Sequence, residues 1–320
     1  MRAVLPESTE LPRLGEVPDP RPAAGEVLVR VAATALNRAD LLQLRGLYPP
    51  PPGESPVPGL ECAGEVVEGG PGTGAFEAGD RVMALVAGGG QAELAAVPVG
   101  QLIPVPESLG LVEAAALPEA ALTAWTNLVF EGRLEAGQSV LITAAASGVG
   151  TFAVQLAREL GATVLVAGRS LERLEPLRDL GVSELVRLGP DLPARVRELT
   201  GGGAHLVLEM AGGEHLPRSL QALRYLGRLV LVGLLAGAGA QIDLGLVLRQ
   251  RLQIVGSVLR SRSREEKASL VADFRSFAAP RLEDGRLKPI VDRILPFEEI
   301  SRGYQAMAAG GVTGKIVLEM

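Results

Sequence analysis

A loop of small residues near the middle of the chain has the composition of a phosphate-binding turn. Residues 139–151 run from a short apolar strand through this loop into a helix, whose N-terminal N–H groups attract a pyrophosphate. In the G-x-G-x-x-G fingerprint the glycine positions fall on Ala145, Ser147 and Gly150, so the match is degenerate. The alternative is an ordinary strand-to-helix turn in an alanine-rich chain. The phosphate contacts expected from the loop are Ser147, Gly148, Val149 and Gly150.

The loop after the next predicted strand, residues 163–167, bears on which nicotinamide dinucleotide binds. Enzymes that use NAD place an acidic residue here, which accepts a hydrogen bond from the ribose 2′-hydroxyl. This chain instead has Arg169, Ser170 and, one helical turn later, Arg173. Guanidinium and hydroxyl groups bind a 2′-phosphate, which favours NADPH as the cofactor. Alternatively, the two arginines are solvated charges and Ser170 caps the next helix.

Polar side chains also gather in the first fifty residues. Asn37 and Asp40 lie at the start of a short predicted helix. Tyr48 precedes four consecutive prolines, which exclude helix and favour an extended loop. Asp40 either orients Asn37 or pairs with a nearby arginine.

Composition argues against several classes of function. The formal net charge of −6 and the acidic pI of 5.3 argue against a nucleic-acid or membrane-surface partner, because either favours a basic face. Cys62 is the single cysteine, and His205 and His215 lack the paired spacing of metal ligands, so we expect no disulfide and no metal. The N-terminus lacks a signal peptide's apolar segment, and no apolar run is long enough to span a membrane. We expect a cytoplasmic protein.

The predicted strands follow two different patterns in two parts of the chain. Short strands separated by glycine-containing turns indicate a compact antiparallel β domain, with strands at residues 26–35, 62–67, 80–85 and 92–97. From residue 139 onward strands alternate with amphipathic helices, which is typical of a parallel sheet covered on both faces. Its predicted strands are residues 140–143, 163–167, 184–188, 206–210, 228–232 and 253–258. Its predicted helices are residues 150–160, 171–180, 192–199 and 216–223.

The C-terminal sixty residues break this alternation. Ser263 and Glu266 have the spacing of a capping box that opens a helix. Strands predicted at residues 289–295 and 315–318 can return to the N-terminal β domain. The fold class is therefore α/β, a doubly wound parallel-sheet dinucleotide domain inserted into a mainly antiparallel β domain. The expected boundaries are residues 119–259 for the inserted domain and residues 1–118 with 260–320 for the other.

Several short motifs, spread over both expected domains, resemble those of one family. They are residues 35–40 (ALNRAD), 46–51 (GLYPPP), 59–64 (GLECAG), 79–82 (GDRV), 122–125 (LTAW), 146–150 (ASGVG) and 314–317 (GKIV). The chain resembles the medium-chain dehydrogenase/reductase superfamily. Within it, the chain is similar to the zinc-independent NADPH:quinone oxidoreductases, the zeta-crystallin-like group, and in particular the p53-inducible quinone reductase type. The resemblance implies a GroES-like catalytic domain and a homodimer.

The zinc-dependent members of this superfamily differ at two positions. In those alcohol dehydrogenases a ligand cysteine occupies the position that matches Asn37, and a ligand histidine the position that matches Leu60. Neither residue is a good zinc ligand, so the resemblance implies a metal-free site. Without a Lewis acid an alcohol is difficult to oxidise, whereas a quinone or an activated alkene accepts hydride readily.

The resemblance also implies which residues form the active site. Asn37 and Tyr48 border the nicotinamide and the substrate in a cleft between the domains. Tyr48 either donates a hydrogen bond or proton to the acceptor oxygen or acts as a wall that stacks on its ring. Lys315 either reaches a cofactor phosphate or is a solvated lysine. The other implied cofactor contacts are Thr123, Gly233, Leu234, Leu259 and Arg260.

The sequence therefore predicts an NADPH-dependent reductase that transfers hydride to a quinone without a metal. One alternative is an NADPH-dependent enoyl or alkenal reductase that acts on α,β-unsaturated carbonyls. A second alternative is a protein that binds NADPH in a structural or regulatory role and catalyses nothing.

Overall fold

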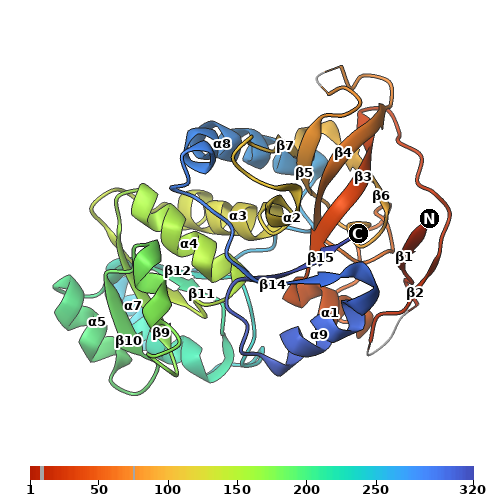
Figure 1. Cartoon of the computed structure of the whole chain (residues 1–320). Helices are drawn as coiled ribbons and strands as arrows, with labels where there is room; N and C mark the ends of the chain where they lie inside the picture. The colour runs from red at the N-terminus through yellow and green to blue at the C-terminus, as the bar shows by residue number, and fades with distance from the viewer. Residues whose placement is uncertain (8–10, 75) are drawn as a thin grey trace. The chain divides into compact units, whose positions relative to one another are not determined.

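A computed structural model describes residues 1–7, 11–74 and 76–320. The chain forms two compact units (Figure 1). The first unit contains residues 1–122 and 259–320, and the second contains residues 123–258. The chain therefore leaves the first unit once and returns to it. This arrangement has the inserted parallel-sheet domain and the antiparallel domain that the sequence predicts, so the predicted fold class is confirmed.

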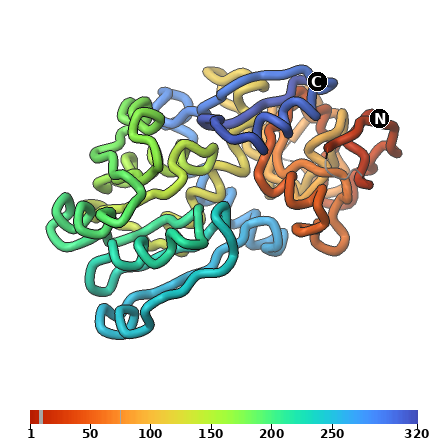
Figure 2. Tube along the Cα trace, turned by 90° about the horizontal axis from the view of Figure 1, so that it is seen from below, coloured from red at the N-terminus to blue at the C-terminus, as the bar shows by residue number. Residues whose placement is uncertain are grey.

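The first unit is built on a mainly antiparallel sheet in the order β14-β15-β3-β4-β5-β7, with β6 also paired to β3. Strand β15 pairs antiparallel with β3, Val317 opposite Ala35, so the C-terminal strand does return to the N-terminal sheet. Figure 2 shows the corresponding red-orange and dark blue segments within the same unit. The strands of this sheet are β3 (Glu26–Ala35), β4 (Glu61–Gly69), β5 (Arg81–Leu85), β6 (Leu94–Pro98), β7 (Leu102–Pro104), β14 (Val291–Pro296) and β15 (Lys315–Glu319).

Helices α1 (Arg38–Leu44), α2 (Leu111–Ala114), α8 (Arg264–Glu283) and α9 (Ile300–Ala309) belong to this unit, and α3 (Pro118–Trp125) begins in it. The predicted capping box of α8 is confirmed, because Ser263 Oγ accepts a hydrogen bond from Glu266 N at 3.1 Å and Glu266 Oε2 accepts one from Ser263 N at 2.9 Å. Helix α9 is absent from the sequence prediction. Its Tyr304 is fully buried in a core that includes Leu36, Leu41 and Phe297.

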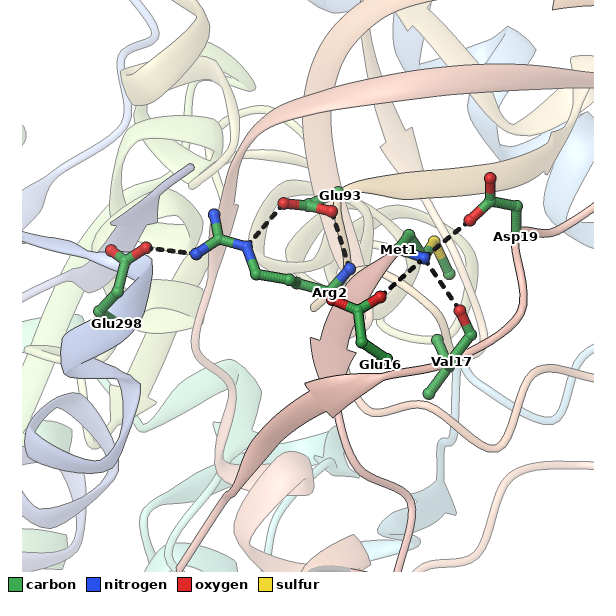
Figure 3. A network of polar contacts seen from close by, with 7 residues as sticks. All are labelled: Met1, Arg2, Glu16, Val17, Asp19, Glu93 and Glu298. Carbon is green, nitrogen blue, oxygen red and sulfur yellow. Dashed lines mark hydrogen bonds and ion pairs between the residues drawn. The ribbon is translucent and has the colours of Figure 1, made fainter.

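A small ribbon of β1 (Arg2–Val4) and β2 (Leu14–Glu16) lies in the first unit, with Ala3 and Val4 buried and a network of polar contacts around Met1 and Arg2 (Figure 3). Arg2 Nε donates to Glu93 Oε1 at 2.7 Å and Arg2 Nη1 donates to Glu298 Oε1 at 2.8 Å. The Met1 ammonium donates to Asp19 Oδ1 at 2.8 Å. The side chains of these ion pairs are largely exposed, so water and salt screen them and they contribute little to stability.

Within residues 123–258, all of which the structure describes, a six-stranded parallel sheet runs in the order β10-β9-β8-β11-β12-β13. Its strands are β8 (Ser139–Thr143), β9 (Thr163–Gly168), β10 (Glu184–Arg187), β11 (Ala204–Glu209), β12 (Leu223–Leu231) and β13 (Gln253–Gly256). Its helices are α4 (Gly148–Glu159), α5 (Leu192–Thr200), α6 (Leu216–Gln221) and α7 (Leu244–Gln250). Apolar residues of α5 and α6 share one core with strand residues such as Leu141 and Leu165.

Three helical segments differ from the prediction. The helix expected at residues 171–180 is a short 3₁₀ helix, Glu175–Leu180, which begins beside Pro176. Residues 112–125 favour helix in the sequence except at Pro118, and the structure divides them between α2 and α3, with Pro118 as the first residue of α3 and a π-helical turn, Thr126–Phe130, after it. Helix α7 is missing from the prediction, although its Leu244, Val247 and Leu248 have helical spacing in the sequence, and none of its residues is buried in the structure.

None of the helices in the described ranges is both long enough and apolar enough to span a membrane.

Candidate cofactor and active site

The loop between β8 and α4 has the geometry of a phosphate-binding turn. Ser147 is the N-cap of α4, and its Oγ accepts a hydrogen bond from Gly150 N at 3.1 Å. A Cβ on Gly150 would lie 2.5 Å from the carbonyl oxygen of Ala145, so only glycine allows the helix to start this close to the strand. The N–H groups of Gly148 and Val149 begin the helix and have no partner one turn back, which leaves them for an anion.

A buried carboxylate that sequence reasoning missed holds the neighbouring strand end. Glu209, the last residue of β11, is fully buried. Its Oε1 accepts from Thr143 Oγ1 at 2.9 Å, from Ala211 N at 2.8 Å and from Gly212 N at 2.9 Å, and its Oε2 accepts from Ser219 Oγ. Glu209 therefore joins the end of β8, the loop after β11 and helix α6. An acidic residue closing an apolar strand, just before paired glycines, was the signal in the sequence.

The loop after β9 is basic and open. Arg169 and Arg173 are exposed, and Ser170 is half-buried. Ser170 caps no helix, because the 3₁₀ helix that follows starts only at Glu175 and has Leu174 as its N-cap, so the capping role of Ser170 is wrong, whereas the roles of Arg169 and Arg173 stay predictions. A third arginine, Arg187 of β10, donates Nη1 to the carbonyl oxygen of Arg169 at 3.2 Å. The sequence did not indicate Arg187, because the pairing of β10 with β9 brings it to this loop.

The other implied cofactor residues of the second unit lie in different surroundings. Gly233 follows β12, and a Cβ there would lie 2.8 Å from the carbonyl oxygen of Met210. Leu234 has an exposed side chain, whereas Thr123 is buried and its carbonyl oxygen accepts from Asn127 Nδ2 at 2.7 Å. In the first unit, Leu259 is buried directly before Arg260.

In the first unit Asn37 and Lys315 meet at a buried carboxylate, Glu61. Lys315 Nζ lies 2.6 Å from Glu61 Oε1 and donates to Asn37 Oδ1 at 2.6 Å. Asn37 Nδ2 donates to Glu61 Oε1 at 2.8 Å and to the carbonyl oxygen of Ala35 at 3.3 Å. Lys315 is only 5% exposed, so the expectation of a solvated lysine is wrong. Both hydrogen atoms of the Asn37 amide are bound within the unit.

Asp40 orients Asn37 and forms no ion pair with an arginine among the described residues of its unit. Asp40 Oδ2 accepts from Asn37 N at 2.8 Å and from Gln91 Nε2 at 3.1 Å. Gln91 Oε1 in turn accepts from the hydroxyl of Tyr304 at 2.8 Å. Burial raises the pKa of Asp40 to about 7. The arginine pairing that the sequence left open is therefore replaced by a network of neutral hydrogen-bonding groups.

Glu119, at the start of α3, is a second carboxyl group with an unusual pKa. Its backbone N–H donates to Glu61 Oε2 at 2.8 Å, so the Glu61 carboxylate is fixed from both sides. Burial, and secondarily the negative charge of Glu61, raises the pKa of Glu119 to about 8. Glu119 is therefore mainly protonated at neutral pH, next to the ion pair of Glu61 and Lys315.

Replacing Glu119 with glutamine is expected to change how stability depends on pH. The pKa of Glu119 is higher in the folded chain than its ordinary value of 4.5, so its stabilising contribution is complete below pH 4.5 and is lost as pH rises through about 8. Glu119→Gln, which cannot ionise, should match the original chain at pH 5 and exceed it at pH 9 by about 2 to 4 kcal/mol. Urea unfolding at pH 5 and pH 9 measures the difference in stability, and Glu107→Gln, at an exposed position, is the control. Equal differences at pH 5 and pH 9 would contradict the raised pKa.

Arg260 positions Tyr48. Its Nη1 donates to the carbonyl oxygen of Tyr48 at 2.8 Å, and its guanidinium carbon lies 5.2 Å from the centre of the Tyr48 ring. Its Nη2 donates to Gln43 Oε1 at 2.6 Å and its Nε to the carbonyl oxygen of Ala87 at 2.7 Å. Tyr48 is half-buried, and burial raises the pKa of its hydroxyl. No described residue of the first unit forms a hydrogen bond with that hydroxyl, which leaves it for a ligand.

Comparison with known proteins matches both units to described families. Residues 23–107 match the alcohol dehydrogenase GroES-like domain, and residues 148–274 match the zinc-binding dehydrogenase family. The chain is 31% identical over 323 residues to quinone oxidoreductase-like protein 2 of Bos taurus, covering 100% of this chain and 92% of that protein.

Solved structures show the same likeness. The quinone oxidoreductase from Thermus thermophilus, whose complex with NADPH is known, is 35% identical with a TM-score of 0.83, and the match covers 100% of both chains. A structure described as an NAD-dependent alcohol dehydrogenase is 30% identical with a TM-score of 0.87, again over 100% of both chains. The likeness therefore extends to proteins described with either dinucleotide.

Proposed function

The chain belongs to the medium-chain dehydrogenase/reductase superfamily and is an NAD(P)-dependent oxidoreductase, and from that premise we propose that it is an NADPH-dependent quinone reductase. The observation that carries the choice of NADPH is the basic loop after β9. Arg169 and Arg173 are exposed there, Arg187 binds the loop's backbone, and no acidic residue lies between residues 166 and 171 to accept from a ribose 2′-hydroxyl.

The residues of the second unit suit the phosphates of this cofactor. The first turn of α4, with Ser147, Gly148, Val149 and Gly150, would bind the pyrophosphate. Arg169, Ser170 and Arg173 would bind the 2′-phosphate. Arg187 would contribute to the same site, because it contacts the backbone of this loop. Thr123, Gly233, Leu234 and Leu259 stay predicted contacts.

Replacing Arg169 with alanine is expected to weaken NADPH binding by about 1.5 to 3 kcal/mol, because a charged hydrogen bond to the 2′-phosphate is lost. NADH lacks that phosphate, so its affinity should hardly change. Titration calorimetry with each dinucleotide measures both values. The matched control is Arg195→Ala, which removes an exposed arginine from α5 in the same unit. Equal losses for NADPH and NADH would count against the 2′-phosphate role.

The residues proposed to act on the acceptor lie in the first unit. NADPH supplies the hydride, and negative charge then develops on the acceptor oxygen. Tyr48 is our candidate for the group that stabilises this charge or delivers the proton, because its hydroxyl has no hydrogen-bond partner within the described part of its unit. Asn37 would help to position neighbouring groups and would not contact the acceptor, because its amide is hydrogen-bonded to Glu61 and Lys315.

Replacing Tyr48 with phenylalanine separates the two roles of this side chain. If the hydroxyl acts on the acceptor, kcat should fall about 100-fold while the affinity for NADPH stays unchanged. An unchanged kcat would show that only the ring matters. Tyr225→Phe is the control, since the Tyr225 hydroxyl is exposed in the second unit and accepts from Arg251. Initial rates with NADPH and a simple quinone measure the effect.

A substrate panel tests the proposed reaction itself. NADPH oxidation is followed with simple benzoquinones and naphthoquinones and, in parallel, with linear enones. Turnover with quinones is the expected result. Turnover with enones alone would replace the proposal by an alkenal or enoyl reductase, and tight NADPH binding without turnover of either class would indicate the non-catalytic role.

A second copy of the chain is the partner that the family resemblance implies. Exposed apolar side chains on the edge strand β13 and on α7 agree with such a contact, among them Leu244, Leu248 and Ile254. The homodimer stays a prediction, and the molar mass in solution by light scattering tests it.

A further inference from the structure

The zinc-binding dehydrogenase family that residues 148–274 match implies a metal, and the residues of this chain do not fit one. The two positions assigned to zinc ligands hold an amide, Asn37, and an apolar side chain, Leu60. Across residues 1–7, 11–74 and 76–320, no three His, Cys, Asp or Glu side chains gather as a metal site. The proton that neutralises the acceptor oxygen is therefore assigned to a group of the chain.

Glu119 has a carboxyl group without a hydrogen-bond partner in the described part of its unit. Its backbone N–H donates to Glu61 Oε2 at 2.8 Å, which fixes the start of α3, but the carboxyl oxygens of Glu119 take part in no hydrogen bond. The side chain is half-buried, so the carboxyl group is withdrawn from much of the water and still has access to a ligand. By contrast, the unpaired Oδ1 of Asp40 is sealed within the unit and has no such access.

The Glu119 carboxyl group and the Tyr48 hydroxyl lie close together. The pKa of the Tyr48 hydroxyl is raised by burial and, next in size, by the negative charge of an ionised Glu119, which requires proximity. Arg260 fixes the Tyr48 ring, with its guanidinium carbon 5.2 Å from the ring centre. Glu119 N and Asn37 Nδ2 bind the two oxygens of Glu61, at 2.8 Å each. Two polar groups without partners therefore belong to one cluster of the first unit.

Charged side chains from four elements act on Glu119. Burial is the largest influence and raises the pKa of Glu119 to about 8. The negative charges of Glu61 in β4 and Asp40 in α1 act in the same direction, whereas Lys315 in β15 and Lys267 in α8 act against it. The carboxyl group therefore holds its proton at neutral pH and, with a pKa near that pH, is suited to release it during a reaction.

The acid strengths of the two groups decide which of them delivers a proton. A hydroquinone oxygen is phenolic, and phenols such as tyrosine ionise near a pH of about 10. The pKa of Tyr48 is raised above that of an ordinary tyrosine, so proton transfer from Tyr48 to the acceptor is uphill. Transfer from Glu119, whose pKa is about 8, is downhill.

We propose that Glu119 is the catalytic acid that protonates the acceptor oxygen, while the Tyr48 hydroxyl orients that oxygen by donating a hydrogen bond. This inference rests on the proposed function, reduction of a quinone by NADPH. The hydride brings the electron pair that reduces the quinone and oxidises NADPH. The O–H bond of Glu119 breaks as a new O–H bond forms on the acceptor, and the carboxylate that remains recovers a proton from water. One quinone, one hydride and one proton thus give one hydroquinone.

The pH dependence of a single turnover with NADPH and 1,4-naphthoquinone tests the proposal. In the original chain the rate should fall as pH rises through about 8, because only protonated Glu119 delivers a proton. Glu119→Gln cannot ionise, so its rate should be about 100-fold lower at neutral pH and should show no fall near that pKa. Asp40, whose pKa is about 7, stays in both proteins, so the step that disappears belongs to Glu119. An unchanged rate, or the same fall in Glu119→Gln, would overturn the proposal.

Two further variants separate the acid from its neighbours. Tyr48→Phe should lower the rate and keep the fall through about pH 8, because the carboxyl group is still present. If Tyr48→Phe removes the fall and Glu119→Gln keeps it, the tyrosine is the acid and the proposal is wrong. Glu107→Gln, at an exposed position in the same unit, is the matched control and should keep the original rate and pH dependence. Equal losses in Glu107→Gln and Glu119→Gln would also overturn the proposal.

The choice of acceptor distinguishes failure of the acid from failure of the proposed function. An original chain that oxidises NADPH with enones but not with quinones would contradict quinone reduction alone, and the same comparison of Glu119→Gln with the original chain is then made with the enone. An original chain that turns over neither class would overturn both the proposed function and the catalytic acid.

Infrared difference spectroscopy tests the proton on Glu119 without cofactor or acceptor. Across neutral and alkaline pH, the original chain should lose the band of a protonated carboxyl group with a midpoint of about 8. Glu119→Gln should lack this transition, and Glu107→Gln should keep it. A transition that persists in Glu119→Gln, or an original chain without one, would show that Glu119 holds no proton to deliver.

Discussion

Replacing Glu209 with alanine is expected to lower the free energy of unfolding by about 3 to 5 kcal/mol, one of the two largest effects we predict. The substitution removes the acceptor of four donors, Thr143 Oγ1, the N–H groups of Ala211 and Gly212, and Ser219 Oγ. Each buried donor left without a partner costs free energy, and water has little access because Glu209 is fully buried.

Urea unfolding followed by circular dichroism measures the loss. Glu198→Ala is the control, because that exposed carboxylate only pairs with Arg195 on α5 and should change stability by less than about 1 kcal/mol. The stability of Glu209→Gln should lie between those of Glu209→Ala and Glu198→Ala, since the amide keeps one acceptor oxygen but places an NH₂ group among donors. An alanine variant as stable as the control would show that the network contributes nothing to folding.

Cofactor binding should weaken in the same variant. Gly212 and Gly213 adopt positive φ values of 65° and 53° directly after β11, and Glu209 holds the Gly212 N–H. Without the carboxylate, nothing in this network fixes the loop that follows β11. NADPH affinity in Glu209→Ala should therefore fall while the Glu198→Ala control retains it.

Replacing Arg260 with methionine is the second large effect we expect. The variant leaves three acceptors without their donor: the carbonyl oxygens of Tyr48 and Ala87 and the amide oxygen of Gln43. Arg260 is only 3% exposed, so water has little access to replace these hydrogen bonds. Hydrogen bonds to a charged group contribute about 1.5 to 3 kcal/mol each, and the lost contacts are not additive, so we expect about 3 to 4 kcal/mol less stability.

The catalytic consequence distinguishes a positioning residue from a merely structural one. Because Arg260 fixes the Tyr48 backbone and packs on its ring, kcat should fall at least about tenfold. The effect should largely disappear in a Tyr48→Phe background if Arg260 acts through the Tyr48 hydroxyl. The exposed Arg30→Met is the control for loss of an arginine from this unit. Full, additive loss in both backgrounds would contradict the positioning role.

The role of Arg260 also refines an expectation from the sequence. The resemblance implied that the backbone near Arg260 contacts the cofactor, and that stays a prediction. The structure adds that the Arg260 side chain points into its own unit, where its hydrogen bonds to Gln43, Tyr48 and Ala87 join helix α1, the residue before the prolines and the segment after β5.

Sequence periodicity predicts most of the fold because it reports local preferences. Strand β3 is predicted at residues 26–35, as observed, and the alternation from residue 139 identifies the parallel sheet. The errors arise where local signals are weak. Proline prevents a full helix at residues 171–180, and α7 is only seven residues long.

The sequence by itself determined the family, the two kinds of sheet, and the small-residue turn at residues 145–150, since spacing and side-chain size decide these locally. Only the tertiary structure decided the partners of the polar side chains. Lys315 and Glu61 lie near opposite ends of the chain, and strand pairing places them together where water does not compete. The same chemical groups would be solvated charges on an isolated strand, because burial and neighbours, which only the assembled fold supplies, set their pairing and pKa.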